Sequence, residues 1–239
     1  MQGWDLAMTA VPVVAAGGAG LSASARRPGR RVTSGLQHFA AGVVIAAAAL
    51  ELLPEVVRER GVVPLVGFAL GVAVMFGMRA LTGLVEGRSP SASGSKLPLG
   101  LVGATAVDFL IDGLVLGAGF TAGGHTGVLL AIAIAIEYVF VGLSLAGAMD
   151  GESSRLLMVG VPVLLSVLTV GGALLGVWLL AGVSDVMLAG VLAFGAVAFM
   201  YLATEELLVE AHARGETAVG STAFYVGFLV ILVIEQALR

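Results

Sequence analysis

The chain has 239 residues, of which 59% are hydrophobic and only 12% are charged. A soluble domain is about half apolar and about a quarter charged, so this composition and a mean hydropathy of +1.06 exclude a water-soluble fold. The net charge of −4 offers no extended basic surface for nucleic acid. The lack of cysteine excludes disulfides and thiolate metal sites.

The apolar residues form eight runs separated by charged and Gly/Pro/Ser-rich clusters. Each run is long enough to cross a ~30 Å hydrocarbon layer as a helix, and none shows the alternating polarity of a membrane β-strand. We therefore predict an all-α integral membrane protein whose residues 1–239 form a single transmembrane domain. The first run lacks a basic n-region and a clear cleavage site, so we expect a retained span rather than a signal peptide. The predicted spans are residues 6–22, 36–53, 62–81, 97–120, 126–149, 156–180, 186–209 and 218–238.

The basic residues predict the orientation of the spans. Three of the 12 Lys and Arg, namely Arg58, Arg60 and Arg239, lie on one predicted side. By the positive-inside rule, the side that holds the other nine is cytoplasmic, so both termini face the extracellular or periplasmic side of the cell membrane. The polar stretch 86–96 is then a flexible cytoplasmic loop. The nine are Arg26, Arg27, Arg30, Arg31, Arg79, Arg88, Lys96, Arg155 and Arg214.

Two pairs of similar segments suggest an internal repeat. Residues 51–55, ELLPE, resemble residues 206–210, ELLVE, and residues 108–114, DFLIDGL, resemble residues 137–143, EYVFVGL. The spans in each pair run in opposite directions across the membrane. Inverted repeats are a recurrent plan of secondary transporters, so the pattern favours a carrier, although Leu-rich segments also match by chance.

Three acids lie deep within predicted spans, where an isolated charge costs about 2.5–3.5 kcal/mol. Asp108 and Asp112 are four residues apart and share one helix face, and Glu137 occupies the matching place on the next span. No basic residue is predicted in mid-span, so charge balance requires a bound cation or protons. We predict that Asp108, Asp112 and Glu137 hold a metal ion. The alternative is that protonated acids bind backbone carbonyls and hold helices together.

Further acids and the three histidines fall near predicted span ends. The simplest interpretation of the acids is interfacial contact with water. The alternative is that Glu51 and Glu206 line a path for cations, which makes them weaker candidates for metal ligands. We expect the histidines to be surface or interfacial residues. The acids are Glu51, Glu55, Glu205, Glu206 and Glu210, and the histidines are His38, His125 and His212.

The sequence resembles the ZIP family of divalent-metal transporters in three segments. Residues 38–55 are similar to the second helix of that family with its LLPE ending, residues 109–113, FLIDG, to the metal motif of its fourth helix, and residues 199–208 to its seventh helix. The resemblance extends over essentially the whole chain, because the number of spans, the outward termini and the long cytoplasmic loop also agree. It implies a ZIP-like arrangement of eight helices with an inverted repeat and, by analogy, a homodimer.

The chain departs from the family at several ligand positions. By this resemblance, Asp108 stands at a position where the family usually has His, and Phe109 stands where it usually has Asn. Glu137 stands where the family usually has His or Gln. Tyr138 and Val141 stand where acids or similar ligands are usual. The binuclear site typical of the family is therefore reduced to one site of three carboxylates. Such oxygen-only ligands favour Mn²⁺ or Mg²⁺, whereas imidazole is well suited to Zn²⁺.

The leading interpretation is a secondary transporter of divalent metal cations such as Zn²⁺, Mn²⁺ or Fe²⁺, with no prosthetic group and no enzymatic activity. In an elevator-type alternating-access motion, the helices that bear the site would slide at glycine-rich contacts around Gly67, Gly71, Gly171 and Gly172. The alternative is a ZIP-like protein that has lost metal transport and moves protons or a small solute, or acts as a membrane sensor. An aspartyl enzyme is disfavoured because Asp108 and Asp112 share one helix.

Overall fold

The computed structural model describes residues 3–25, 29–86, 99–148, 155–213 and 218–238. Within these ranges the chain is helical apart from short connections and contains no strand. Within the same ranges, eight helices are long and apolar enough to cross a membrane, which confirms the predicted all-α class and agrees in number with the eight predicted spans. Of the predicted loop 86–96, only Glu86 lies within the described residues, as the last residue of a helix.

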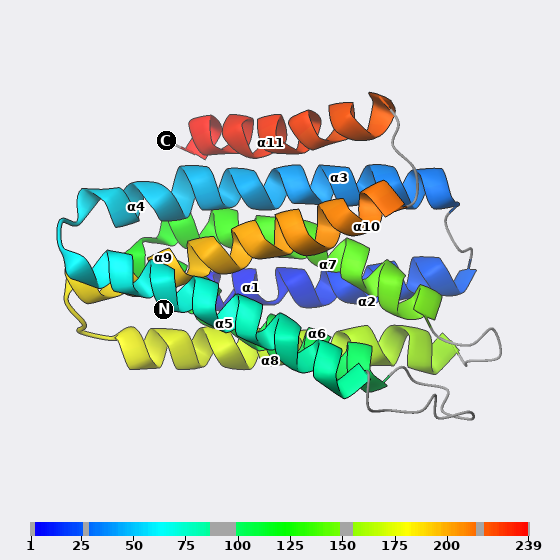
Figure 1. Ribbon diagram of the computed structural model, residues 1–239, viewed down its shortest axis with the longest axis horizontal. Helices are drawn as coiled ribbons and strands as arrows, with labels where there is room; N and C mark the ends of the chain where they lie inside the picture. Colours follow the sequence, from blue (N-terminus) through cyan, green and yellow to red (C-terminus); the bar gives the residue numbers. More distant parts are fainter. Residues whose placement is uncertain (1–2, 26–28, 87–98, 149–154, 214–217, 239) are drawn as a thin grey trace.

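The helices run roughly parallel or antiparallel to one long axis (Figure 1). The second and seventh spans are the longest, Arg31–Arg58 and Asp185–Ala213, and each combines three consecutive helical segments. The second begins before the predicted residue 36. The segments are α1 (Gly3–Thr9), α2 (Val11–Ala25), α3 (Arg30–Ala47), η1 (Ala48–Leu52), α4 (Leu53–Arg58), α5 (Val62–Glu86), α6 (Leu99–Ala122), α7 (Gly124–Ala148), α8 (Arg155–Leu180), α9 (Asp185–Tyr201), η2 (Leu202–Leu207), α10 (Leu208–Ala213) and α11 (Ala218–Leu238).

The segments η1 and η2 are π-helical turns, and they fall where the two ELL segments of the sequence match. Pro54 follows η1 and removes one backbone donor from the helix. The seventh span has no proline there; instead, Thr204 Oγ1 donates to the Met200 carbonyl at 2.8 Å, a bond that bends helices. Single π-helical turns frequently occur at functional sites.

The helices pack as two groups. In the first group, α6 packs along α8, and α2 packs against α7 and α8. In the second group, α3 packs along α11, and α5 packs along α9. The groups meet mainly where α3 contacts α7 and where α6 contacts α9. In Figure 1, α11 and α3 lie on one side of the molecule and α8 on the other.

Glycines allow the closest helix crossings within each group. A Cβ at Gly117 of α6 would lie 2.5 Å from the Ala173 carbonyl oxygen of α8, and one at Gly67 of α5 would lie 2.0 Å from the Gly190 oxygen of α9. Neither distance is physically accessible to a real side chain, so these positions require glycine. Gly113 lies equally close to α8, 2.4 Å from the Thr169 oxygen by the same measure, and therefore serves packing.

Of the four glycines expected at helix contacts, Gly67, Gly71 and Gly172 lie at such contacts. The expectation is wrong for Gly171, where an added Cβ would meet nothing within 4 Å. Gly171 and Gly172 are adjacent, and successive residues of a helix point about 100° apart. Only Gly172 therefore faces α6.

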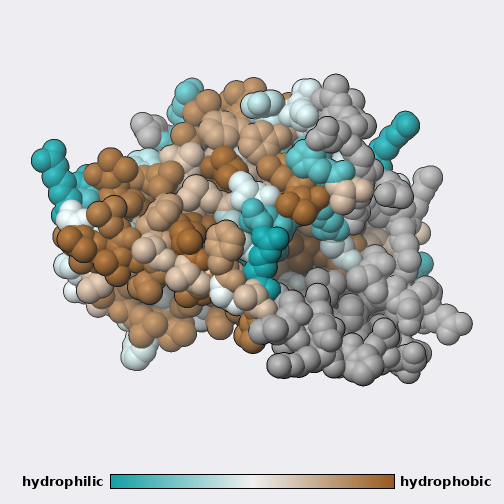
Figure 2. Space-filling view, in the orientation of Figure 1, coloured by the Kyte–Doolittle hydropathy of each residue, from teal (hydrophilic) through white to brown (hydrophobic). Residues whose placement is uncertain are grey.

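Apolar side chains cover much of the outer surface. Figure 2 shows hydrophobic residues over most of the described face, with hydrophilic residues near its middle and its edges. Large apolar side chains on α5, α8 and α11 are exposed, as expected for helices that contact lipid or a second subunit. They include Leu65, Phe76, Leu164, Trp178 and Leu229.

The crossing of α6 and α8 predicts the effect of one methyl group. Gly117→Ala should lower the free energy of unfolding by about 1–3 kcal/mol, because the backbone of α8 must move away. Gly171→Ala is the matched control and should leave stability unchanged or slightly raised, because alanine favours the helix. Thermal unfolding in detergent measures both. Equal melting temperatures for the two variants would contradict the close approach.

Candidate cation site

The structure brings Asp108, Asp112 and Glu137 together. Each offers a carboxylate oxygen, and these three oxygens lie within 4.8 Å of one another. Asp108 and Asp112 come from adjacent turns of α6, as their spacing predicts, and Glu137 comes from α7. Asp112 is 2% exposed and Glu137 is fully buried. We call these residues the three-carboxylate cluster.

The carboxylate of Glu137 has no compensating partner. Both of its oxygens are buried without a hydrogen bond. None of the ion pairs seen within the described part of the chain involves Asp108, Asp112 or Glu137. Since an unpaired buried charge is very costly, the cluster requires either a bound cation or protons.

Tyr138 fixes the position of Asp112. Its hydroxyl donates to Asp112 Oδ2 at 3.2 Å and lies 2.5 Å from Thr169 Oγ1 of α8. A phenol has one proton, so the Thr169 hydroxyl must donate to Tyr138 when Tyr138 donates to Asp112. The Tyr138 ring stacks on Phe109, with centroids 3.7 Å apart and planes 14° apart. Phe109 and Tyr138 thus provide an aromatic support beside the site.

A cavity of about 370 Å³ reaches the three-carboxylate cluster at Asp108. It lies at the end of the bundle that the sequence predicts to be cytoplasmic. Its walls are formed by residues of α5, α6, α7, α9, η2 and α10. Its wall is acidic and includes Glu205, Glu206 and Glu210. Glu206, a weaker candidate ligand, therefore lines this cavity but does not belong to the three-carboxylate cluster.

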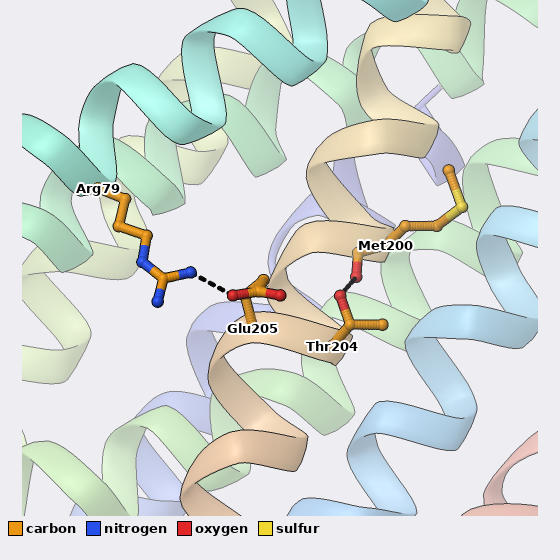
Figure 3. Close-up of polar contacts among 4 residues, drawn as sticks. All are labelled: Arg79, Met200, Thr204 and Glu205. Atoms are coloured by element: carbon orange, nitrogen blue, oxygen red, sulfur yellow. Dashed lines mark hydrogen bonds and ion pairs between the residues drawn. The ribbon is translucent and has the colours of Figure 1, made fainter.

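Arg79 introduces a positive charge into the cavity wall. It lies within α5, near the end of the predicted span 62–81, and forms an ion pair with Glu205 of η2 (Figure 3). Both side chains are partly exposed, so the pair contributes little to stability. It does link α5 to η2 beside the cavity.

A second cluster of possible ligands contains Glu51 of η1, His125 of α7 and Glu235 of α11. Glu51 is only 4% exposed, so the expectation that it meets water at the interface is wrong. His125 is partly exposed, and its Nε2 forms a hydrogen bond with Glu235 Oε2. Glu235 is not among the ligands predicted from the sequence, although an acid near the end of an apolar span is a usable signal.

The other two histidines lie near each other at the opposite end. His38 is 3% exposed, contrary to the expectation of a surface residue, and its Nδ1 lies 2.8 Å from the Ser34 carbonyl oxygen. His212 is exposed, and its ring packs edge-on against that of His38 at 5.2 Å. His38 lies inside α3, which begins at Arg30, and its ring is covered by α11, where a Cβ at Gly220 would lie 3.0 Å from it.

Neither a scan of protein-family models nor a search of curated proteins finds a match for the chain.

Substitution of Glu137 tests the unpaired charge. Glu137→Gln should raise the free energy of unfolding of the metal-free protein by about 1–3 kcal/mol, because it removes the cost of either burying an unpaired charge or taking up a proton. Glu55→Gln is the control and should have little effect, because Glu55 pairs with Arg58 at the partly exposed end of the span. Chemical unfolding in detergent with a chelator measures both. A less stable Glu137→Gln variant would show that the native side chain is already satisfied.

Removing the hydroxyl of Tyr138 tests the support of Asp112. Tyr138→Phe should lower stability by about 1 kcal/mol, because it leaves Thr169 and Asp112 without a bond while the stacked ring remains. Thr169→Val in the same chain should restore part of this loss, because both partners are then apolar. Tyr225→Phe, at an exposed position, is the control. Strictly additive losses in the double variant would contradict the bond.

Proposed function

We propose that this chain is a secondary transporter of divalent metal cations, and that the cation binds the three-carboxylate cluster between α6 and α7. The observation that carries the proposal is the buried Glu137 carboxylate, whose unpartnered oxygens lie beside two further carboxylates. A bound cation would satisfy these oxygens and offset the mutual repulsion of the three acids. Charged residues inside a membrane commonly mark ion pathways.

The charge and chemistry of the cluster favour a divalent ion. Three carboxylates carry up to three negative charges, and a divalent ion neutralises more of them than a monovalent one. All three ligands are oxygen atoms, which suit Mn²⁺ and Mg²⁺ best, while the ZIP resemblance adds Zn²⁺ and Fe²⁺ as substrates. In this mechanism, Tyr138 orients Asp112 toward the ion through its hydroxyl.

The cavity supplies a route between the cluster and one end of the molecule. Asp108 belongs both to the cluster and to the cavity wall, so an ion can leave the cluster past an acidic surface. Toward the other end, α6 and α7 are filled by the fully buried side chains of Leu116, Leu129 and Leu130. We therefore infer a state open to the predicted cytoplasmic side and closed to the other.

The two helix groups provide the moving parts. All three carboxylates belong to the group of α2, α6, α7 and α8, so this group can carry the ion as a unit past the group of α3, α5, α9 and α11. The matching π-helical turns η1 and η2 support an inverted repeat of the ZIP type. The exposed apolar face of α5 is available for the expected homodimer.

Transport by the purified protein tests the proposal. Proteoliposomes should accumulate Mn²⁺ or Zn²⁺ in a saturable manner, and Asp112→Asn should reduce the rate at least about tenfold, because the ion loses a charged ligand. Glu55→Gln, outside the cluster and the cavity, should retain transport. Proton or solute flux without metal uptake would instead favour the alternative derived from the sequence. Metal uptake equal to that of empty vesicles would overturn the proposal.

A further inference from the structure

Glu51, His125 and Glu235 form a compact group at the end of the bundle opposite the cavity. One potential ligand atom from each lies within 4.8 Å of the other two. His125 Nε2 contacts Glu235 Oε2 and lies 4.0 Å from Glu51 Oε1. The Glu51 and Glu235 side chains are only 4% and 6% exposed.

Glu51 has an unsatisfied atom that faces this group. Its Oε1 is buried and has no hydrogen-bond partner, and this is the oxygen nearest the His125 ring. A buried carboxylate oxygen without a donor is costly unless a cation is near. Since His125 Nε2 already contacts Glu235, one imidazole does not satisfy both carboxylates. We propose that Glu51, His125 and Glu235 form a second cation site, which binds a divalent transition metal of the Zn²⁺ type.

The ligand chemistry selects the class of metal. Two carboxylates and one neutral imidazole balance a divalent charge, and the mixed nitrogen and oxygen set suits Zn²⁺ better than Mg²⁺ or Ca²⁺. Ligand atoms around tetrahedral Zn²⁺ lie roughly 3.3 Å apart, so the 4.0 Å separation of His125 and Glu51 needs only a small side-chain movement. The His125 side chain is 34% exposed, so water can reach the fourth position.

This site is separate from the three-carboxylate cluster. His125 and Glu137 lie 12 residues apart on α7, which corresponds to about 18 Å along the helix. Its ligands also come from both helix groups: η1 and α11 belong with α3, whereas α7 belongs with α6. An ion bound here would therefore join the two groups at the predicted extracellular or periplasmic end and hold that end closed.

Metal binding should be measured with the first cluster disabled. The full-length variant Asp108→Asn/Asp112→Asn/Glu137→Gln is stripped with a chelator and titrated with Zn²⁺ by calorimetry in detergent, and bound zinc is counted after gel filtration. We expect saturable binding of one Zn²⁺ per chain. Adding His125→Gln or Glu235→Gln should abolish it, whereas His212→Gln and Glu55→Gln, outside the site, should not. Because the first cluster is absent, failure of the transport proposal does not affect this result.

A stability measurement separates loss of the site from loss of the fold. Zn²⁺ should raise the melting temperature of the triple variant and leave it unchanged once His125→Gln is added. If the triple variant does not fold, His125→Gln in the wild-type chain should lower the bound zinc by one ion per chain. Absence of saturable Zn²⁺ binding in a folded triple variant, or binding that survives His125→Gln, would overturn the proposal.

Discussion

The structure depends most on a cluster of three carboxylates, two of them buried, that no basic side chain among the described residues neutralises. Asp112 and Glu137 are nearly or completely inaccessible, and both Glu137 oxygens lack partners. In a medium of low polarity, such a group raises the energy of the folded state unless a proton or cation accompanies it. The surrounding helices must therefore hold the acids close together while leaving access for a positive charge.

The packing of α6 on α8 makes this arrangement rigid on one side. Gly113 and Gly117 let the two backbones approach, and this proximity brings Thr169 within bonding distance of Tyr138 and so supports Asp112. On the other side, the cavity leaves Asp108 accessible. The three-carboxylate cluster thus lies between a close helix crossing and an acidic cavity.

Local patterns in the sequence predicted much of this fold and part of the site. Apolar runs predicted eight spans, and the four-residue spacing of Asp108 and Asp112 predicted their shared face, because both depend only on helix geometry. The group of Glu51, His125 and Glu235 was not predicted, because it joins residues up to 184 positions apart whose contact depends on how distant helices pack. No periodicity within one span contains that information.

Helix α7 contributes a residue to each of the two clusters, and movement between the helix groups would affect the two clusters differently. Twelve residues of an α-helix turn through about 1200°, so His125 and Glu137 point about 120° apart around α7. Glu137 faces α6, within its own helix group, whereas His125 faces η1 and α11 of the other group. Relative movement of the groups would therefore leave the three carboxylates together but separate His125 from Glu51 and Glu235. One helix thus contributes Glu137 to a cluster that lies within one helix group and His125 to a cluster that joins the two groups.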